Sequence, residues 1–177
     1  MLVQPFINLA PNLKRYDRRY LTERIVIHRI ALGARASDII VAFSGGISLA
    51  AKATGYKMPY HYVVESDGSV IQTLPLDVIG PHAWKWNDRS IGVACVGDFR
   101  IHEPPKAQWY AAARLCRSLE MLYRADIWGH DELPEGSTDP QKVCPGAKWN
   151  LPFFLGAVRH MAITGADIVD FEQASVF

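Results

Sequence analysis

The stretch "YHYVVESDGSVIQTLP", residues 60–75, contains two short apolar runs separated by Ser66, Asp67 and Gly68. Asp-Gly between two alternating apolar runs is the strongest short-range signal for a β-hairpin, because glycine readily adopts the positive φ that a tight turn requires. The stretch therefore predicts two paired antiparallel strands, which form the start of a larger sheet.

Three further runs predict strands of the same sheet. The run "ERIVIHRIAL" (23–32) is rich in β-branched residues and carries His28 near its end. The run "SIGVACVGDF" (90–99) is closed by Gly97-Asp98, and "ADIWGH" (125–130) ends on His130. Together with the hairpin, these runs predict a sheet of about five strands.

Helical segments alternate with these strands. Between residues 106 and 124, apolar side chains recur at spacings of three and four, as on the buried face of an amphipathic helix: Trp109, Ala112, Cys116, Leu119 and Tyr123. Residues 37–53 are expected to be helical from an N-cap at Ser37, with an interruption at Gly45-Gly46. The run "LPFFLGAVRHMA" predicts a final helix.

This alternation predicts an α/β (α+β) fold with a central mixed sheet and helices packed on both faces. We find no internal repeat, low-complexity tract or linker in the sequence, so we expect a single domain over residues 1–177. A chain of 177 residues with 49% hydrophobic and 21% charged residues can bury a sufficient core without disulfides.

Composition also excludes several classes of partner. The formal net charge is +1, so we expect no nucleic-acid partner, and we interpret the basic cluster at 13–24 as solvated surface. No apolar run approaches the ~20 residues that span a bilayer, so no integral membrane association is expected. The N-terminal stretch lacks the features of a secretory signal, so we expect cytoplasmic synthesis.

The three cysteines have different surroundings. Cys95 lies within a predicted strand and Cys116 on the apolar face of a predicted helix, so both are expected to be core residues. Cys144 lies in a Pro/Gly/Asp-rich loop and has no such explanation. A catalytic zinc ion commonly takes three His, Cys or carboxylate ligands, and His28, His130 and Cys144 form such a set. Spacing alone leaves open the alternative that each is an ordinary packing residue.

Several stretches, in order, resemble the type 2 N-acetylmuramoyl-L-alanine amidases, a family that includes phage endolysins and peptidoglycan recognition proteins. The resemblance covers roughly residues 23–155 and leaves 156–177 as a C-terminal helix and tail. The stretches that resemble the family's motifs are "IVIHRI", "MPYHYVVESDGSVIQTLP", "GPHAWKWNDRSIGVACVGDF" and "GHDEL...QKVCPG".

The resemblance implies roles for particular residues. It implies that His28, His130 and Cys144 hold Zn²⁺. Tyr60 and Lys142 match catalytic positions of the family. The predicted substrate-binding residues are His82, Trp84 and Asn87. From the residues alone, Trp84 and Trp86 could equally form an aromatic wall for the substrate or partly exposed packing.

The resemblance also implies an activity. We expect a zinc amidase that hydrolyses the bond between N-acetylmuramic acid and L-alanine of the stem peptide, acting on the cell wall after release as a phage or prophage endolysin. Peptidoglycan or a muropeptide is the expected partner of a monomeric protein. The alternatives are a non-catalytic peptidoglycan-binding module and a muropeptide-recycling amidase. A cysteine at 144 favours the endolysin and recognition-protein branch, because the recycling enzymes carry an aspartate there.

Overall fold

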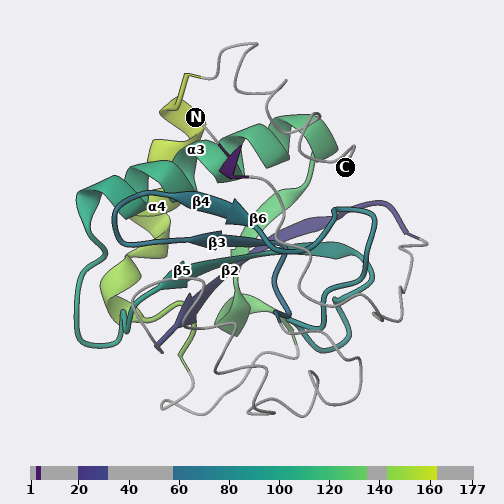
Figure 1. Ribbon diagram of the computed structural model, residues 1–177, viewed down its shortest axis with the longest axis horizontal. Coiled ribbons are helices and arrows are strands. Elements are labelled where there is room, and N and C mark those ends of the chain that lie inside the picture. The colour runs from purple at the N-terminus through teal and green to yellow at the C-terminus, as the bar shows by residue number, and fades with distance from the viewer. Residues whose placement is uncertain (1–2, 5–19, 32–57, 135–142, 163–177) are drawn as a thin grey trace.

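The computed structural model describes residues 3–4, 20–31, 58–134 and 143–162. These residues form a six-stranded sheet in the order β1-β4-β3-β5-β2-β6 with two α-helices beside it (Figure 1). The strands are β1 Val3–Gln4, β2 Arg24–Ile30, β3 Tyr62–Val64, β4 Val70–Gln72, β5 Ser90–Val96 and β6 Asp126–Gly129. The helices are α3 Lys106–Tyr123 and α4 Leu151–His160, with 3₁₀ turns η1 His130–Glu132 and η3 Ala147–Trp149.

The sheet is mixed, as the sequence predicts. Strands β3 and β4 pair antiparallel, whereas β2 pairs parallel with both β5 and β6, and β5 pairs parallel with β3. The five expected strands are all present, and β1 adds a sixth strand of two residues beside β4. A strand this short leaves no periodic pattern in a sequence.

The hairpin between β3 and β4 forms at the predicted turn. Gly68 has a φ of +90°, and its N–H donates to the carbonyl of Glu65 at 3.0 Å. The Asp67 carboxylate accepts a hydrogen bond from the backbone N–H of Ser69 at 2.8 Å, which fixes the turn. These contacts confirm that the Asp-Gly pair directs the chain back on itself.

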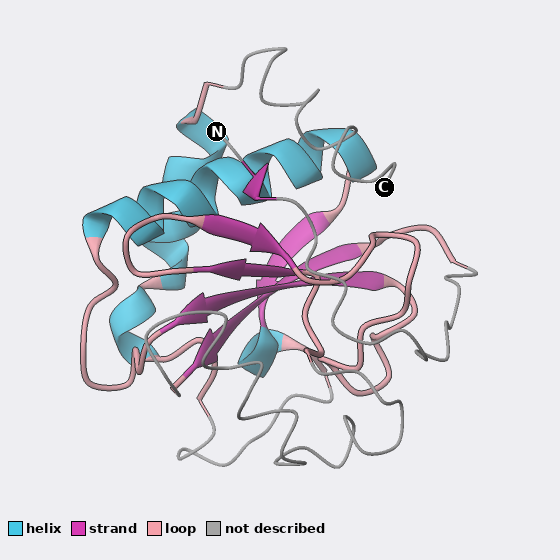
Figure 2. Cartoon of the chain, viewed as in Figure 1, coloured by secondary structure: helices cyan, strands magenta, loops and turns pink. Residues whose placement is uncertain are grey.

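Helices α3 and α4 cover one face of the sheet (Figure 2). Ile25 and Ile27 of β2 point to this face and are fully buried, because alternate residues of a strand share a face. The predicted apolar stripe of α3 packs against them. Phe154 of α4 and the neighbouring Trp149 are among the largest fully buried side chains and close this core.

The alternate side chains of β2 point to the opposite face of the sheet. Val26 and Ile30 lie there in two smaller apolar clusters, and His28 lies between them along the strand. Among the described residues, only the short turn η1 is helical on this side (Figure 2). The helix expected over 37–53, the loop 135–142 and the tail after residue 162 lie outside the described residues. No helix of the described residues is long and apolar enough to cross a membrane.

Candidate metal centre

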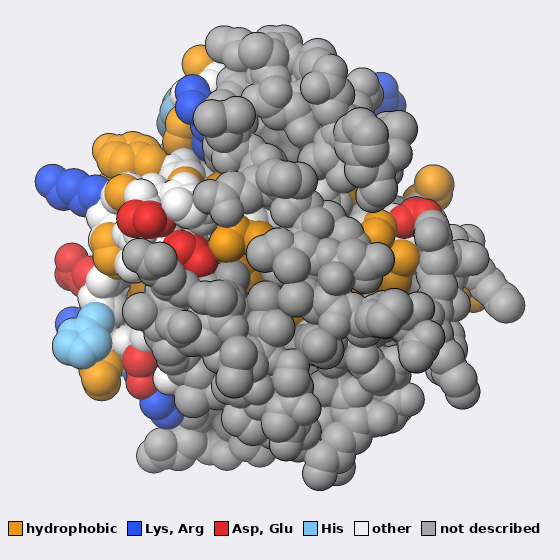
Figure 3. Space-filling view, in the orientation of Figure 1, with side chains coloured by type: hydrophobic (Ala, Val, Ile, Leu, Met, Phe, Trp, Pro, Cys, Tyr) orange, Lys and Arg blue, Asp and Glu red, His pale blue; other side chains and the backbone are white. Residues whose placement is uncertain are grey.

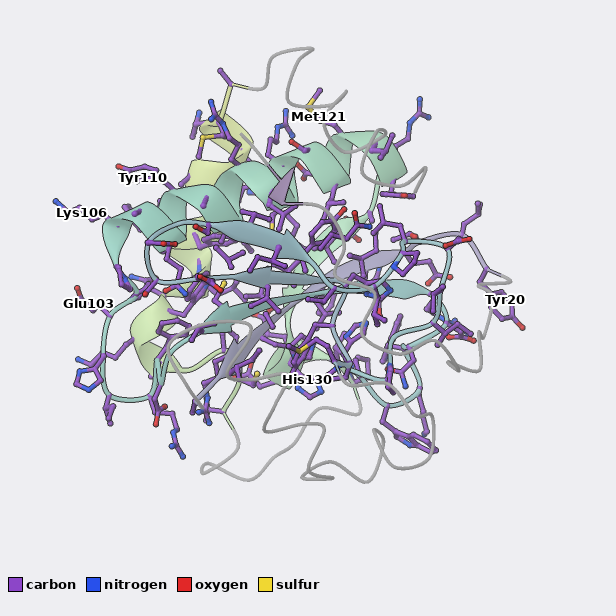
Figure 4. All side chains as sticks on the ribbon, in the orientation of Figure 1. Tyr20, Glu103, Lys106, Tyr110, Met121 and His130 are labelled. Atoms are coloured by element: carbon purple, nitrogen blue, oxygen red, sulfur yellow. The ribbon has the colours of Figure 1, made fainter. Side chains whose placement is uncertain are left out.

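Two histidines meet where two parallel strands end. Ile27 of β2 pairs with Gly129 of β6, so the following residues, His28 and His130, are neighbours across the sheet. Their ring centroids lie 4.6 Å apart. Figure 4 places the labelled His130 on the side of the sheet away from α3, the face onto which His28 points. The strand ends therefore bring together residues that are distant in sequence.

Cys144 reaches the same place from the loop before η3. Its Sγ atom lies 3.9 Å from Nδ1 of His28, and the donor atoms of His28, His130 and Cys144 all lie within 4.8 Å of one another. The backbone N–H of Asp131 donates to the Cys144 carbonyl at 3.0 Å, which ties the loop to η1. These residues form a group that could hold a metal ion.

Arg29 anchors the cysteine loop through two contacts and forms an ion pair with Asp98. Its backbone N–H points at Sγ of Cys144 at 3.4 Å, and its Nε donates to the carbonyl of Val143 at 3.0 Å. Its Nη1 pairs with Asp98 at 3.1 Å. The Arg100 side chain and Arg29 together hold the pKa of the Asp98 carboxyl far below its usual range. Sequence reasoning missed Arg29 and Asp98, and the only available signal was that Arg29 follows a candidate ligand.

Burial sets the protonation of the three donors. It lowers the pKa of His28 well below 6.5, assisted by His82, His130 and His61, and it also lowers the pKa of His130. Burial raises the pKa of Cys144 to about 11, partly offset by the Arg29 backbone N–H. At neutral pH the imidazoles are therefore uncharged and offer lone pairs, whereas the thiol must release a proton when it binds a metal.

Tyr60 borders this cluster. Its ring centroid lies 5.0 Å from that of His28. Burial, and secondarily the Cys144 thiolate, raise the pKa of the phenol. Tyr60 therefore stays protonated and can donate a hydrogen bond beside the donors. Lys142, the other expected catalytic residue, lies outside the described residues.

Comparison with known proteins identifies the family. The N-acetylmuramoyl-L-alanine amidase family matches residues 18–147. The chain belongs to this family. Peptidoglycan-recognition protein SC2 of Drosophila melanogaster is 30% identical over 96 residues, which cover 51% of this chain and 49% of that protein. The chain thus spans about half the length of this curated relative.

Solved structures share the fold. The endolysin N-acetylmuramoyl-L-alanine amidase LysCS of Clostridium intestinale superposes with a TM-score of 0.71 at 18% identity, covering 89% of this chain and 97% of that one. The Ph2119 endolysin of a Thermus scotoductus bacteriophage gives a TM-score of 0.64 at 26% identity, covering 80% of this chain and 88% of that one. The expected α/β architecture of the amidase family is thereby confirmed.

Among the residues expected to bind substrate, His82 takes a different position in this amidase-family chain. We predicted that His82 binds substrate, and its side chain is buried, with 8% of its surface exposed. Its Nδ1 lies 3.0 Å from Nε2 of His28, on the opposite side of that ring from Cys144. Its contacts suit a residue that orients a metal ligand.

Trp84 and Asn87 lie on the loop after His82. Asn87 accepts a hydrogen bond from the backbone N–H of Ala83 at 2.6 Å and so shapes this loop, whereas Trp84 is 77% exposed. Trp86 is partly buried beneath the guanidinium groups of Arg24 and Arg89. The two tryptophans therefore differ: Trp86 is a packing residue, and Trp84 is free of the core.

Of the remaining histidines and cysteines, Cys95 and Cys116 lie in the core, as the sequence predicts. His61 is fully buried, with Nδ1 accepting from the Gly92 N–H at 3.0 Å and Nε2 donating to the Val78 carbonyl at 2.9 Å. Because both ring nitrogens are engaged, it supports the structure and is not a ligand. Cys95 and Cys116 are buried core residues, and His102 and His160 are exposed.

Proposed function

We propose that this chain is a zinc-dependent amidase that hydrolyses the bond between N-acetylmuramic acid and L-alanine in peptidoglycan. The observation that carries this proposal is the convergence of His28, His130 and Cys144, with donor atoms within 4.8 Å of one another, beside the protonated phenol of Tyr60. Family membership supports this class of bond, and the donor set supports zinc as the metal.

The donor set fits zinc. Two imidazoles and one thiolate are ligands that zinc prefers, and three protein ligands leave a fourth position open, as in catalytic sites. Zn–N bonds of ~2.0 Å and Zn–S bonds of ~2.3 Å place two nitrogen donors and one sulfur donor roughly 3.3–3.6 Å apart in a tetrahedral site. Nδ1 of His28 and Sγ of Cys144 are 3.9 Å apart and all three donors lie within 4.8 Å of one another, so metal binding requires the side chains to move inward.

Each residue has a chemical task in amide hydrolysis. A catalytic zinc ion supplies water activated near neutral pH and polarises the scissile carbonyl. Tyr60 remains protonated in its buried position, so its hydroxyl can donate a hydrogen bond to the oxyanion that develops on that carbonyl. Arg29 holds the Cys144 loop against β2 and so keeps the thiol beside His28. Lys142 is proposed as the second polar group at the substrate.

Two relatives support an endolysin role. The Ph2119 protein is described as a bacteriophage endolysin, and LysCS as an endolysin amidase. A non-catalytic recognition module is the second candidate, because the curated relatives are peptidoglycan-recognition proteins. The intact His28, His130 and Cys144 set favours the enzyme, since binding alone requires no metal ligands. A muropeptide-recycling amidase is the third candidate, disfavoured by the cysteine at 144.

The test uses zinc-loaded protein, purified peptidoglycan and a soluble muropeptide. We expect new L-alanine amino termini from peptidoglycan without new reducing sugar ends. Tyr60→Phe should bind zinc normally and lose about 10²-fold or more in kcat, the usual effect of removing one oxyanion donor. Binding of peptidoglycan without release of peptides by zinc-containing protein would overturn the enzyme proposal. Turnover confined to the soluble muropeptide would instead identify a recycling amidase.

A further inference from the structure

His28 uses its two ring nitrogens in opposite directions. Nδ1 faces Sγ of Cys144 at 3.9 Å, and Nε2 faces Nδ1 of His82 at 3.0 Å. A neutral imidazole carries one proton, so only one of the two nitrogens can offer a lone pair to a metal. Whichever group decides where that proton lies also decides which nitrogen of His28 is the ligand.

Ser90 fixes the proton on His82. The Nε2 of His82 faces the carbonyl of Ser90 at 3.4 Å and its hydroxyl at 3.3 Å. The hydroxyl donates its own proton to the carbonyl of Trp86 at 2.6 Å, so it offers a lone pair toward His82. Because both atoms of Ser90 act as acceptors, Nε2 of His82 carries the proton and Nδ1 is left to accept.

We propose that Ser90 and His82 are positioning residues that set the tautomer of His28. With Nδ1 of His82 accepting, Nε2 of His28 must donate, and Nδ1 of His28 is left with its lone pair toward Cys144. The direction of the hydrogen bonds therefore runs from His28 through His82 to Ser90. The inference rests on the proposed metal site but not on the proposed reaction, and nothing in it requires a substrate.

Packing holds His82 in this position. Its ring lies directly over Gly92 of β5, where an added Cβ would come within 2.7 Å of the imidazole. The His61 ring meets it edge-on with centroids 5.6 Å apart, and His28 meets it edge-on at 5.1 Å. Because Gly92 leaves room for the ring and two imidazoles lie against it, the ring is held with Nδ1 toward His28.

The first experiment reads the tautomer directly. Nitrogen-15 NMR of the histidine rings in the metal-free full chain at pH 7.5 should show His28 protonated at Nε2 and unprotonated at Nδ1. His82→Leu removes the acceptor, so His28 should become a mixture of tautomers. His82→Asn keeps a side-chain oxygen close to the position of Nδ1 and should restore the Nε2–H form. A His28 ring protonated at Nδ1 in the parent protein would overturn the proposal.

The second experiment measures zinc affinity by competition with a chromophoric chelator, without substrate. His82→Leu should weaken zinc binding by roughly 10–100-fold, the usual cost of losing a group that supports a ligand. His82→Asn should recover most of that loss. Ser90→Ala leaves only the carbonyl as acceptor and should weaken binding by roughly twofold to tenfold. Ser118→Ala is the matched control, because Ser118 is a buried serine on α3 whose hydroxyl donates to the Arg114 carbonyl.

The outcomes separate this inference from the proposed function. Parental zinc affinity in both His82→Leu and Ser90→Ala would overturn the positioning role, whatever the enzyme does. Weakened affinity with an altered His28 tautomer would support it even in a protein that releases no peptide from peptidoglycan. If His82→Leu fails to fold, the comparison of His82→Asn, Ser90→Ala and Ser118→Ala still decides the question.

Discussion

Cys144 is held in place before any metal binds. The Arg29 backbone N–H contacts its sulfur, the Arg29 side chain holds the preceding carbonyl, and the Asp131 N–H holds its own carbonyl. The last two contacts are made to backbone carbonyls of the loop, so they do not depend on the sulfur. The loop should therefore keep its shape when the sulfur is removed.

The loss of this sulfur should abolish metal binding but preserve the fold. Cys144→Ala leaves two imidazoles, so we expect zinc affinity to fall by at least 100-fold, with circular dichroism unchanged. Cys116→Ala is the matched control, because that thiol lies on the buried face of α3, on the other side of the sheet from the site, and this variant should bind zinc like the parent. The measurement is equilibrium dialysis with metal analysis. Stoichiometric zinc in Cys144→Ala would show that this ligand assignment is wrong.

The buried histidines should make the metal-free chain sensitive to acid. The folded-state pKa of His28 lies well below 6.5, whereas the unfolded chain has a histidine pKa of about 6.5. Below that pH the unfolded state binds more protons, so the free energy of unfolding falls as pH falls, by at most ~1.4 kcal/mol per pH unit for this residue. Above pH 6.5 its contribution is constant.

Urea unfolding at pH 7.5, 6.5 and 5.5 in the presence of a chelator tests this dependence. His28→Asn should flatten the decline, whereas His160→Asn, at the exposed end of α4, should keep it. If the free energy of unfolding fell equally with pH in the parent and in His28→Asn, the acid sensitivity would come from other residues.

At the level of elements, α4 contributes to the core through one face, which carries Leu151, Phe154 and Val158. Phe154 is fully buried beside Trp149, with ring centroids 5.2 Å apart, whereas the preceding Phe153 is 68% exposed. The two residues share a helix, a residue type and nearly the same helical position. They therefore form a natural pair for measuring what burial contributes.

Phe154→Ala should lower the free energy of unfolding by about 3–5 kcal/mol, because it removes a large buried ring and leaves a cavity. Phe153→Ala should change it by no more than ~1 kcal/mol, since the ring remains largely in water. Chemical denaturation of both variants with zinc removed checks the difference. Equal losses would mean that α4 packs through a different face.

The strands and the hairpin could be predicted from sequence because their signals are local. Asp67-Gly68 specifies a turn within four residues, and the stripe from Trp109 to Tyr123 specifies a buried helix face. The candidate ligands could be identified because strand ends collect at one edge of a parallel sheet. The position of His82 could not, because it depends on the empty space above Gly92, which only the assembled sheet creates. The role of Arg29 could not be predicted either, because its partners are loop residues far along the chain.

At the scale of the whole molecule, the distribution of charge does not indicate where a ligand binds. The net charge is +1, and acidic and basic side chains are interspersed over the described part of the face in Figure 3. The sheet order instead determines where chemistry can occur. β2 lies between β5 and β6, so the ends of three parallel strands and the cysteine loop meet on the face opposite α3 and α4.

A bound ion should slow unfolding more than it speeds folding. The ligands come together only when β2 and β6 have paired and the Cys144 loop has docked, which are late, long-range contacts. Stopped-flow measurements with saturating zinc and with chelator should show a lower unfolding rate in zinc and nearly unchanged refolding. Cys144→Ala should remove the difference. Faster refolding in zinc would show that the metal binds before the sheet forms.

Such an ion also acts as a removable cross-link. It would join His28 to Cys144 across 116 residues of chain, with none of the three cysteines engaged in a disulfide. A chelator would then act on this protein as a reductant acts on a disulfide-bonded one. The stabilisation follows the free zinc concentration as RT ln(1 + [Zn]/Kd), or ~2.7 kcal/mol at 100 times Kd. The folded chain would thus be more stable in a medium rich in zinc than in one depleted of zinc, with no change in any covalent bond.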